Sequence, residues 1–571
     1  MCLDRVVDPS VAQRFAEAAR DDGAGGLERM STLGAGERRS RHTQRDFFRY
    51  SKKISGVRIE PYWVETIARK RSGLASERRP KPILLPHELL AWMYRWSKRR
   101  FHEVMGTAEQ AFDFWWEIRR HSPTWFVEHP CYAAIMESPE KWLPAKIFGD
   151  DARLGKVRAM LAVTLFSAIG SEKRTKYKKL PSFVRNSVDA ILGVTDGPLW
   201  DANAWSWACL ARNEFPAHRH DHKPLDTPWR RKMAGKPILG EFHVALVGLN
   251  GDWLWTADTC NLEQSYKSVG NDICHRCGAT NTGANNFTNF RDDAPFWPER
   301  SNAAYMASAN AQAAPVSRTL GFHVLSVWPE LMHAGPLGYN LTVAGSVMLE
   351  LGQEAFWADR PDSGTWQEKL AIQLSAASAS FSTWQSDNRR RCSQPRFTVR
   401  RLSLTAKCSV PTLKAKAYNS IVVIEWLEHE TRKVAEQWPD NSYFRDRATM
   451  VWGLANFYRV LRRSGKWMAE DELADLKLAR DATLFCFRRL SGIAMEEGSH
   501  LYPCRPKMHV FDECHRLAQT TGENPASTWT FQDEDNMRLL VDIAQSCHGA
   551  TFELATLEKW CCQFFAEEDE P

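Results

Sequence analysis

Two thiols and a later pair of imidazoles are the first residues whose types and spacing suggest chemistry. Cys274 and Cys277 form a CxxC pair in the segment NDICHRCG. This spacing places both sulfurs on one tight turn, where they can bind one tetrahedral Zn²⁺. A single CxxC is only half of such a site. The segment PKMHVFDECH offers His509, Cys514 and His515 as candidates for the other half.

Carboxylates form the second set of candidate residues. Asp252 follows the apolar run 242–249 and a turn-like Asn-Gly pair, so it would lie where a buried strand ends. Asp150 and Asp151 end another short extended run, but Asp also favours turns, and a plain turn is the alternative there. Glu534 lies in the acidic cluster TFQDED at the start of a helical pattern. The alternative reading of that cluster is charge that complements the helix dipole.

Strands and helices must position these residues. Apolar runs near 144–155, 156–169 and 242–249 predict strands of an α/β sheet. Apolar spacing near 3.6 residues predicts helices over 366–374, 413–426, 445–461 and 470–493, and an aromatic-rich helical stretch with basic faces over 81–143. Glu330 and His333 are three residues apart and would be neighbours on a helical turn.

Composition narrows the class of protein. The 571 residues are enough for two or three domains, and the net charge is +6. Basic clusters gather within 36–120 and 171–232, which favours a nucleic-acid partner, with solvated helix faces as the alternative. The 14 cysteines indicate a reducing compartment rather than disulfides. The longest apolar run, 160–169, is too short to span a bilayer, so no membrane partner is expected.

The order of these motifs resembles that of eukaryotic cut-and-paste DNA transposases of the DDE/D type. Three segments carry the resemblance: GDD at 149–151, PELMH at 329–333 and TFQDED at 530–535. The similarity extends over residues 140–550 and is strongest to the CACTA (EnSpm-like) superfamily, with a more distant similarity to Transib and the V(D)J recombinase catalytic subunit. In that group one catalytic Asp lies on the first strand, a second at the end of the fourth, and a Glu on a late helix.

The resemblance implies an RNase H-like mixed-sheet catalytic core, interrupted by a large helical insertion that zinc pins, with a helical N-terminal region. It implies that Asp150, Asp252 and Glu534 are catalytic and hold Mg²⁺ or Mn²⁺, with Asp151 and Asp258 as the substitutes to test. Hard carboxylate oxygens suit Mg²⁺, whereas thiolates and imidazoles suit Zn²⁺. The expected function is therefore Mg²⁺-dependent DNA strand cleavage and transfer.

The same resemblance implies a structural Zn²⁺ bound by Cys274, Cys277, His509 and His515. It also implies double-stranded DNA at the terminal repeats of a mobile element as the partner, a homo-oligomer on that DNA, and a nuclear location. The expected regions are a basic, largely disordered arm (1–80), a helical basic subdomain (81–143), the first part of the core (144–270), a zinc-containing helical insertion (271–500) and a return to the core with the catalytic helix (501–571).

Two alternatives to an active transposase stay open at this point. One is a decayed or domesticated relative that keeps the fold and binds DNA without cutting it. The other is an unrelated zinc-stabilised interaction protein. A missing carboxylate in the folded site would favour the decayed relative, and a large separation of residues 150, 252 and 534 would favour the interaction protein.

Overall fold

A mixed sheet of six strands organises the N-terminal half of this α/β protein. The computed structural model describes residues 9–33, 59–70, 75–155, 158–170, 178–191, 193–264, 270–359, 362–404 and 409–566. The strands are β1 (Tyr62–Arg69), β2 (Ser76–Ile83), β3 (Trp142–Arg153), β4 (Ala159–Ser167), β5 (Leu180–Asn186) and β6 (His243–Gly251). Their order in the sheet is β1-β2-β5-β4-β3-β6. All neighbours are antiparallel except β3 and β6, which are parallel.

The central strands are buried on both faces, which explains their continuous apolar sequences. In β3 the first eight residues are all buried, and in β4 and β6 the interior residues are buried as well. Strands covered on both sides lose the polar alternation of half-exposed strands. By contrast, β1 alternates strictly between buried and exposed residues, as expected for a strand at the sheet edge.

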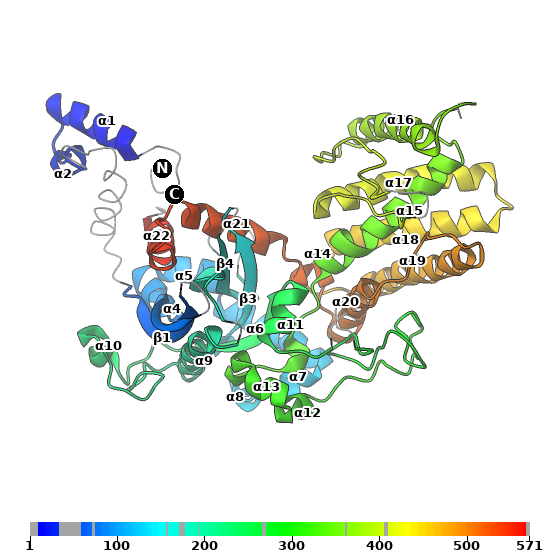
Figure 1. The fold of residues 1–571 in the computed structure, drawn as a ribbon. Coiled ribbons are helices and arrows are strands. Elements are labelled where there is room, and N and C mark those ends of the chain that lie inside the picture. The colour runs from blue at the N-terminus through cyan, green and yellow to red at the C-terminus, as the bar shows by residue number, and fades with distance from the viewer. Residues whose placement is uncertain are drawn as a thin grey trace.

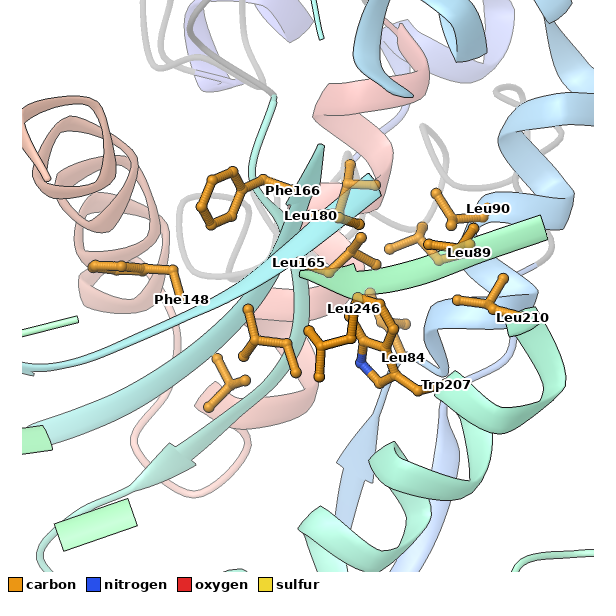
Figure 2. Close-up of a cluster of buried hydrophobic side chains, with 14 of the residues drawn as sticks. Leu84, Leu89, Leu90, Phe148, Leu165, Phe166, Leu180, Trp207, Leu210 and Leu246 are labelled. Atoms are coloured by element: carbon orange, nitrogen blue, oxygen red, sulfur yellow. The ribbon is translucent and has the colours of Figure 1, made fainter. Parts of the chain in front are cut away.

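Helices cover both faces of the sheet. They are α4 (Pro86–Trp96), α5 (Lys98–Met105), α6 (Ala108–His121), α9 (Asp196–Arg212), α11 (Trp253–Thr259), α21 (Phe531–Gln545) and α22 (Phe552–Ala566). Figure 2 shows Leu89, Leu90 and Leu210 on one side of the strands and Phe148 and Phe166 on the other. The sheet is thus the middle layer, and one continuous apolar core includes its strands and these helices.

A second apolar core belongs to the helices between the sheet strands and α21. These helices are α14 (Leu331–Ala334), α15 (Asn340–Gln353), α16 (Trp366–Asp387), α17 (Ala417–Gln437), α18 (Ser442–Arg463), α19 (Glu470–Glu496) and α20 (Lys507–Thr521). Figure 1 shows α15 to α19 gathered away from the sheet, with α20 and α21 leading back to it. Thr365 and Glu368 form a capping box that starts α16. The helices predicted over 366–374, 413–426, 445–461 and 470–493 are confirmed.

The remaining helices are short or lie at the N-terminus. They are α1 (Pro9–Asp21), α2 (Glu28–Ser31), α7 (Thr124–Val127), α8 (Tyr132–Glu137), α10 (Pro228–Met233), α12 (Asn302–Ala307) and α13 (Ala309–Ala313). Helices α1 and α2 pack together, and the Gln13 amide donates a hydrogen bond to the Ser31 carbonyl at 2.7 Å. Within the described ranges, no helix is long and apolar enough to span a membrane.

Three sequence-based expectations are wrong in detail. The sequence predicts a largely disordered arm over residues 1–80. In the structure, however, 62–69 and 76–83 form strands of the sheet, and 9–21 forms a helix. Residues 34–58 and 71–74 of that arm lie outside the described part. Asn250 and Gly251 belong to β6 rather than to a turn, because they pair with β3. Asp150 and Asp151 likewise lie within β3, where cross-strand pairing with β4 overrides the turn preference of Asp.

Candidate active site

Asp150, near the carboxyl end of β3, and Asp252, directly after β6, lie side by side on two parallel strands. The register pairs Gly149 of β3 with Gly251 of β6. Each Asp is the residue that directly follows one of these paired glycines. Asp252 ends β6 and caps α11, where its Oδ1 accepts a hydrogen bond from the Trp255 N–H at 2.7 Å. The sheet therefore brings two carboxylates together that are about one hundred residues apart in the sequence.

The two glycines next to these carboxylates are required by Trp255. A Cβ atom at Gly149 would lie 2.1 Å from the Trp255 ring, and one at Gly251 would lie 2.3 Å from it. Side chains alternate across a strand, so Trp255 covers one face while Asp150 and Asp252 point to the other. The repeated Gly-Asp pair thus combines a close indole contact on one face with a carboxylate on the opposite face.

Glu534 lies on α21 beside His333. The charge of His333 also interacts with the two Asp residues. The Nε2 of His333 lies 3.8 Å from Oε1 of Glu534. The Nδ1 of His333 forms a short hydrogen bond with Glu330, which is buried and caps α14. Glu330 also accepts a hydrogen bond from the Thr530 N–H at 3.1 Å, just before α21 begins. One buried carboxylate therefore positions both the imidazole and the start of the helix that bears Glu534.

Electrostatic interactions link Asp150 with Asp252, and His333 with both of them and with Glu534. Burial and the neighbouring charge of Asp252 raise the pKa of Asp150 to about 7, although the positive charge of His333 opposes the shift. Burial also raises the pKa of Glu534, and His333 again opposes it. Burial alone would lower the pKa of His333, but Glu330, Glu534 and Asp252 outweigh it and raise the value. A cluster of carboxylates with raised pKa values is one that a cation would stabilise.

The substitutes Asp151 and Asp258 lie outside this group. Asp151 is exposed, and its Oδ1 accepts a hydrogen bond from the Ser187 hydroxyl at 2.6 Å. Asp258 is exposed on α11, two turns beyond Asp252. Of the carboxylates singled out from the sequence, the structure places Asp252 beside Asp150 and Glu534 beside His333, and the charge of His333 interacts with all three.

A second cluster contains the CxxC thiols. Ligand atoms of Cys274, Cys277, His509 and Glu513 all lie within 4.8 Å of one another, and all four residues are buried. A hydrogen bond from Cys277 and the adjacent charge of His509 hold the pKa of Cys274 well below its ordinary value, although burial opposes the shift. Oε2 of Glu513 has no hydrogen-bond partner among the described residues. Two sulfurs, one imidazole and one carboxylate oxygen form a donor set that fits tetrahedral Zn²⁺.

His515 is not in this cluster, which corrects the expected ligand set. Along α20, His509 and Glu513 are four residues apart and share a face, whereas His515 is six residues from His509 and points elsewhere. Its Nε2 lies 3.2 Å from the Gln519 side-chain nitrogen, and burial lowers its pKa to about 3. Cys514 is also apart, with its thiol directed at the Pro329 carbonyl.

Three site residues, Glu513, Glu330 and His333, are not among the candidates that the sequence provides, although each has a local signal there. Glu513 is the i+4 neighbour of His509, a spacing that predicts a shared helix face. The spacing of Glu330 and His333 predicts that they are neighbours on a helical turn, but it does not indicate that they belong to the carboxylate site. Their contact with Glu534 joins segments 200 residues apart, so spacing alone could not reveal it.

Several residues counted as a basic surface are structural. Arg100, Lys179 and Arg230 are buried, and Arg230 forms a hydrogen-bonded ion pair with the buried Glu88 at 2.7 Å. The clusters at 38–41 and 52–53 lie outside the described residues. Charge counting therefore overstates the basic area that these stretches offer to a polyanion.

Comparison with known proteins identifies no relative. No protein-family model matches the sequence, and no curated protein matches it significantly. The function of this chain must therefore be inferred from the geometry of the site.

Proposed function

We propose that this chain cleaves and transfers DNA strands in a Mg²⁺-dependent reaction, with an RNase H-like core as the catalytic unit. Counted from β3, the strands β3, β4, β5 and β6 are the first to the fourth. Asp150 then lies on the first strand, Asp252 at the end of the fourth, and Glu534 on a late helix. The parallel pairing of β6 with β3, beside antiparallel β4 and β5, supports the same fold.

The observation that carries the proposal is the convergence of three carboxylates around His333. Their sources are two adjacent strand ends and α21, and the charge of Asp252 acts on Asp150 while that of His333 acts on Asp150 and Glu534. A zinc-stabilised interaction protein has no need for such an arrangement. Perturbed carboxylates gathered at one sheet edge are characteristic of catalytic or metal-binding sites.

Each residue has a definite part in the proposed reaction. Two Mg²⁺ ions, when bound, activate a water or 3′-hydroxyl and stabilise the leaving oxygen. Asp150, Asp252 and Glu534 would hold these ions through their carboxylate oxygens. Glu330 holds Nδ1 of His333, so that Nε2 is directed at Glu534. His333 is therefore a positioning residue for Glu534.

The helices between β6 and α21 are proposed to be an insertion that Zn²⁺ pins to the core. Cys274 and Cys277 precede α14 to α19, and His509 and Glu513 follow them on α20. A metal bound by these four groups would tie together both ends of the helical region. Arg276, buried beside the cluster, donates a hydrogen bond to Oε1 of Glu513 at 3.1 Å and would orient that carboxylate.

The test uses purified full-length protein and two DNA assays, namely nicking of supercoiled plasmid and joining of a labelled 3′-hydroxyl duplex to a plasmid, each with Mg²⁺ or Mn²⁺. We expect Asp150→Asn, Asp252→Asn and Glu534→Gln each to lower both rates at least a hundredfold, about 3 kcal/mol in barrier. Asp151→Asn and Asp258→Asn are the matched controls and should retain activity. Activity that persists in all three site variants would refute the assignment. A parent protein that binds DNA but never cuts it would favour the non-catalytic alternative.

A further inference from the structure

A polar cavity of about 440 Å³ lies between the sheet and the helical region. Lys146 of β3 and Asn250 of β6 line it from the sheet, and the segments 464–466 and 523–533 line it from the other side. The cavity adjoins the proposed active site, because Lys146 lies four residues before Asp150 on the same face of β3. Its opposite wall ends at Asp533, the neighbour of Glu534.

The lining carries an excess of positive charge. The lining residues include four lysines and two acids. The lysines are Lys146, Lys178, Lys179 and Lys466, and the acids are Glu523 and Asp533. The formal sum is four minus two, or +2. Low-dielectric walls strengthen the field of such charges. A ligand with about two negative charges would therefore neutralise the cavity.

Lys146 is the buried lysine of the lining that has no direct ion pair among the described residues, and the charges of Glu523 and Asp533 act on it from beyond contact distance. It is 3% exposed, and within the described part of the chain it has no hydrogen bond or ion pair; its Nζ lies 5.2 Å from the ring centre of Trp328. Lys179 differs, because its Nζ is paired with Asp533 at 2.5 Å. A buried ammonium without a paired anion is unfavourable, so an anion in the cavity would remove that cost.

Two further features suit a phosphate-bearing ligand. The side chain of Asn250 is 2% exposed, lines the cavity, and has no partner for its Oδ1 among the described residues. Its amide can donate to a phosphate oxygen and accept from a hydroxyl. Trp529 and Phe531 also line the cavity and offer apolar surface for a ring. The volume lies within the range of small-molecule pockets.

We propose that this cavity binds a phosphate group, with Lys146 as its principal cation and Lys466 and Asn250 as further contacts. A free nucleotide and the 5′-phosphate end of a DNA strand share this chemistry and fit the same walls. The site requires no metal at Asp150, Asp252 and Glu534. It can therefore be tested separately from the proposed strand-transfer reaction.

The experiment is calorimetric titration of the full chain in chelator, without divalent metal. The ligands are inorganic phosphate, thymidine 5′-monophosphate, thymidine, and a short single-stranded oligonucleotide with and without a 5′-phosphate. We expect the monophosphate to bind at least tenfold more tightly than thymidine. Preference for the monophosphate would identify a free nucleotide as the ligand, and preference for the 5′-phosphorylated oligonucleotide would identify a strand end; both support the site.

Variants locate the binding in the cavity. Lys146→Met keeps the length of the side chain without its charge and should weaken phosphate-dependent binding at least tenfold, whereas Lys141→Met removes an exposed lysine outside the cavity and should not. If Lys146→Met does not fold, Lys466→Gln replaces it, because the Lys466 side chain is 28% exposed. Equal binding of thymidine and its monophosphate, no binding of any phosphate, or full affinity in the folded lysine variants would overturn the proposal.

Discussion

Replacing Asp150 by Asn should stabilise the metal-free protein at alkaline pH. Burial and the charge of Asp252 raise the pKa of Asp150 from 3.8 to about 7. This difference is about three pH units, and each unit corresponds to about 1.4 kcal/mol. The ionised carboxylate therefore destabilises the folded state by up to about 4 kcal/mol above pH 7, and Asp150→Asn removes this term.

The pH dependence has a definite sign. Because the folded-state pKa lies above the unfolded-state value, the folded protein binds more protons than the unfolded chain between about pH 4 and pH 7. The free energy of unfolding should therefore fall as pH rises through that window, and the whole penalty should be present above it. At pH 5 less than half of the penalty remains.

Urea denaturation of the parent and Asp150→Asn at pH 8 and pH 5, in chelator, measures the effect. We expect the variant to be more stable by about 2–4 kcal/mol at pH 8, and by less than half as much at pH 5. Mg²⁺ at pH 8 should stabilise the parent and leave the variant nearly unchanged. Asp151→Asn, at an exposed position, is the control. A variant less stable than the parent at pH 8, or a difference that does not change with pH, would refute the reasoning.

Three further predictions concern the supporting structure. Gly149→Ala should lower the free energy of unfolding by about 1–3 kcal/mol, because its Cβ would lie 2.1 Å from Trp255, whereas Gly492→Ala, with nothing within 4 Å, should be neutral or stabilising by urea denaturation. Cys274→Ser and Glu513→Gln should each reduce bound zinc, measured by mass spectrometry of purified protein, and His515→Gln should leave it unchanged; equal loss in His515→Gln would restore the original ligand set. His333→Gln should slow DNA nicking at least tenfold and raise the Mg²⁺ concentration needed for half-maximal rate, and an unchanged metal dependence would contradict its role in positioning Glu534.

Much of the fold could be predicted from hydrophobic periodicity. The strands β3, β4 and β6 were visible because both of their faces are buried, which makes their sequences continuously apolar. The helices α16 to α19 were visible because their apolar spacing persists over several turns. Strand β2 was missed, since SERRPKPI contains charged residues and two prolines that suggest a loop. Its Lys81 is buried because Asp189 and Glu553, both far along the chain, neutralise it.

The candidate site could be predicted in its residue types more than in its partners. The order of Asp150, Asp252 and Glu534 indicated one site; in the structure Asp252 lies beside Asp150, and His333 lies between these two residues and Glu534. The choice between His515 and Glu513 depended on the rotation of α20, which residue type alone does not give. Counting four residues from His509 would have favoured Glu513, whereas the resemblance implied a pair of histidines.

The ion pair between Lys81 and Glu553 has a consequence for the order in which the protein can fold. Glu553 accepts hydrogen bonds from Lys81 Nζ at 2.5 Å and from the Asn186 N–H at 2.7 Å, partners that precede it by 472 and 367 residues. At roughly 5–20 residues per second, Lys81 is made about half a minute to a minute and a half before Glu553, the closer of its two counter-ions. One face of the sheet therefore remains incompletely covered until α21 and α22 have been synthesised. Folding of the sheet and its covering helices should accordingly be late, slow and dependent on the last helices to be synthesised.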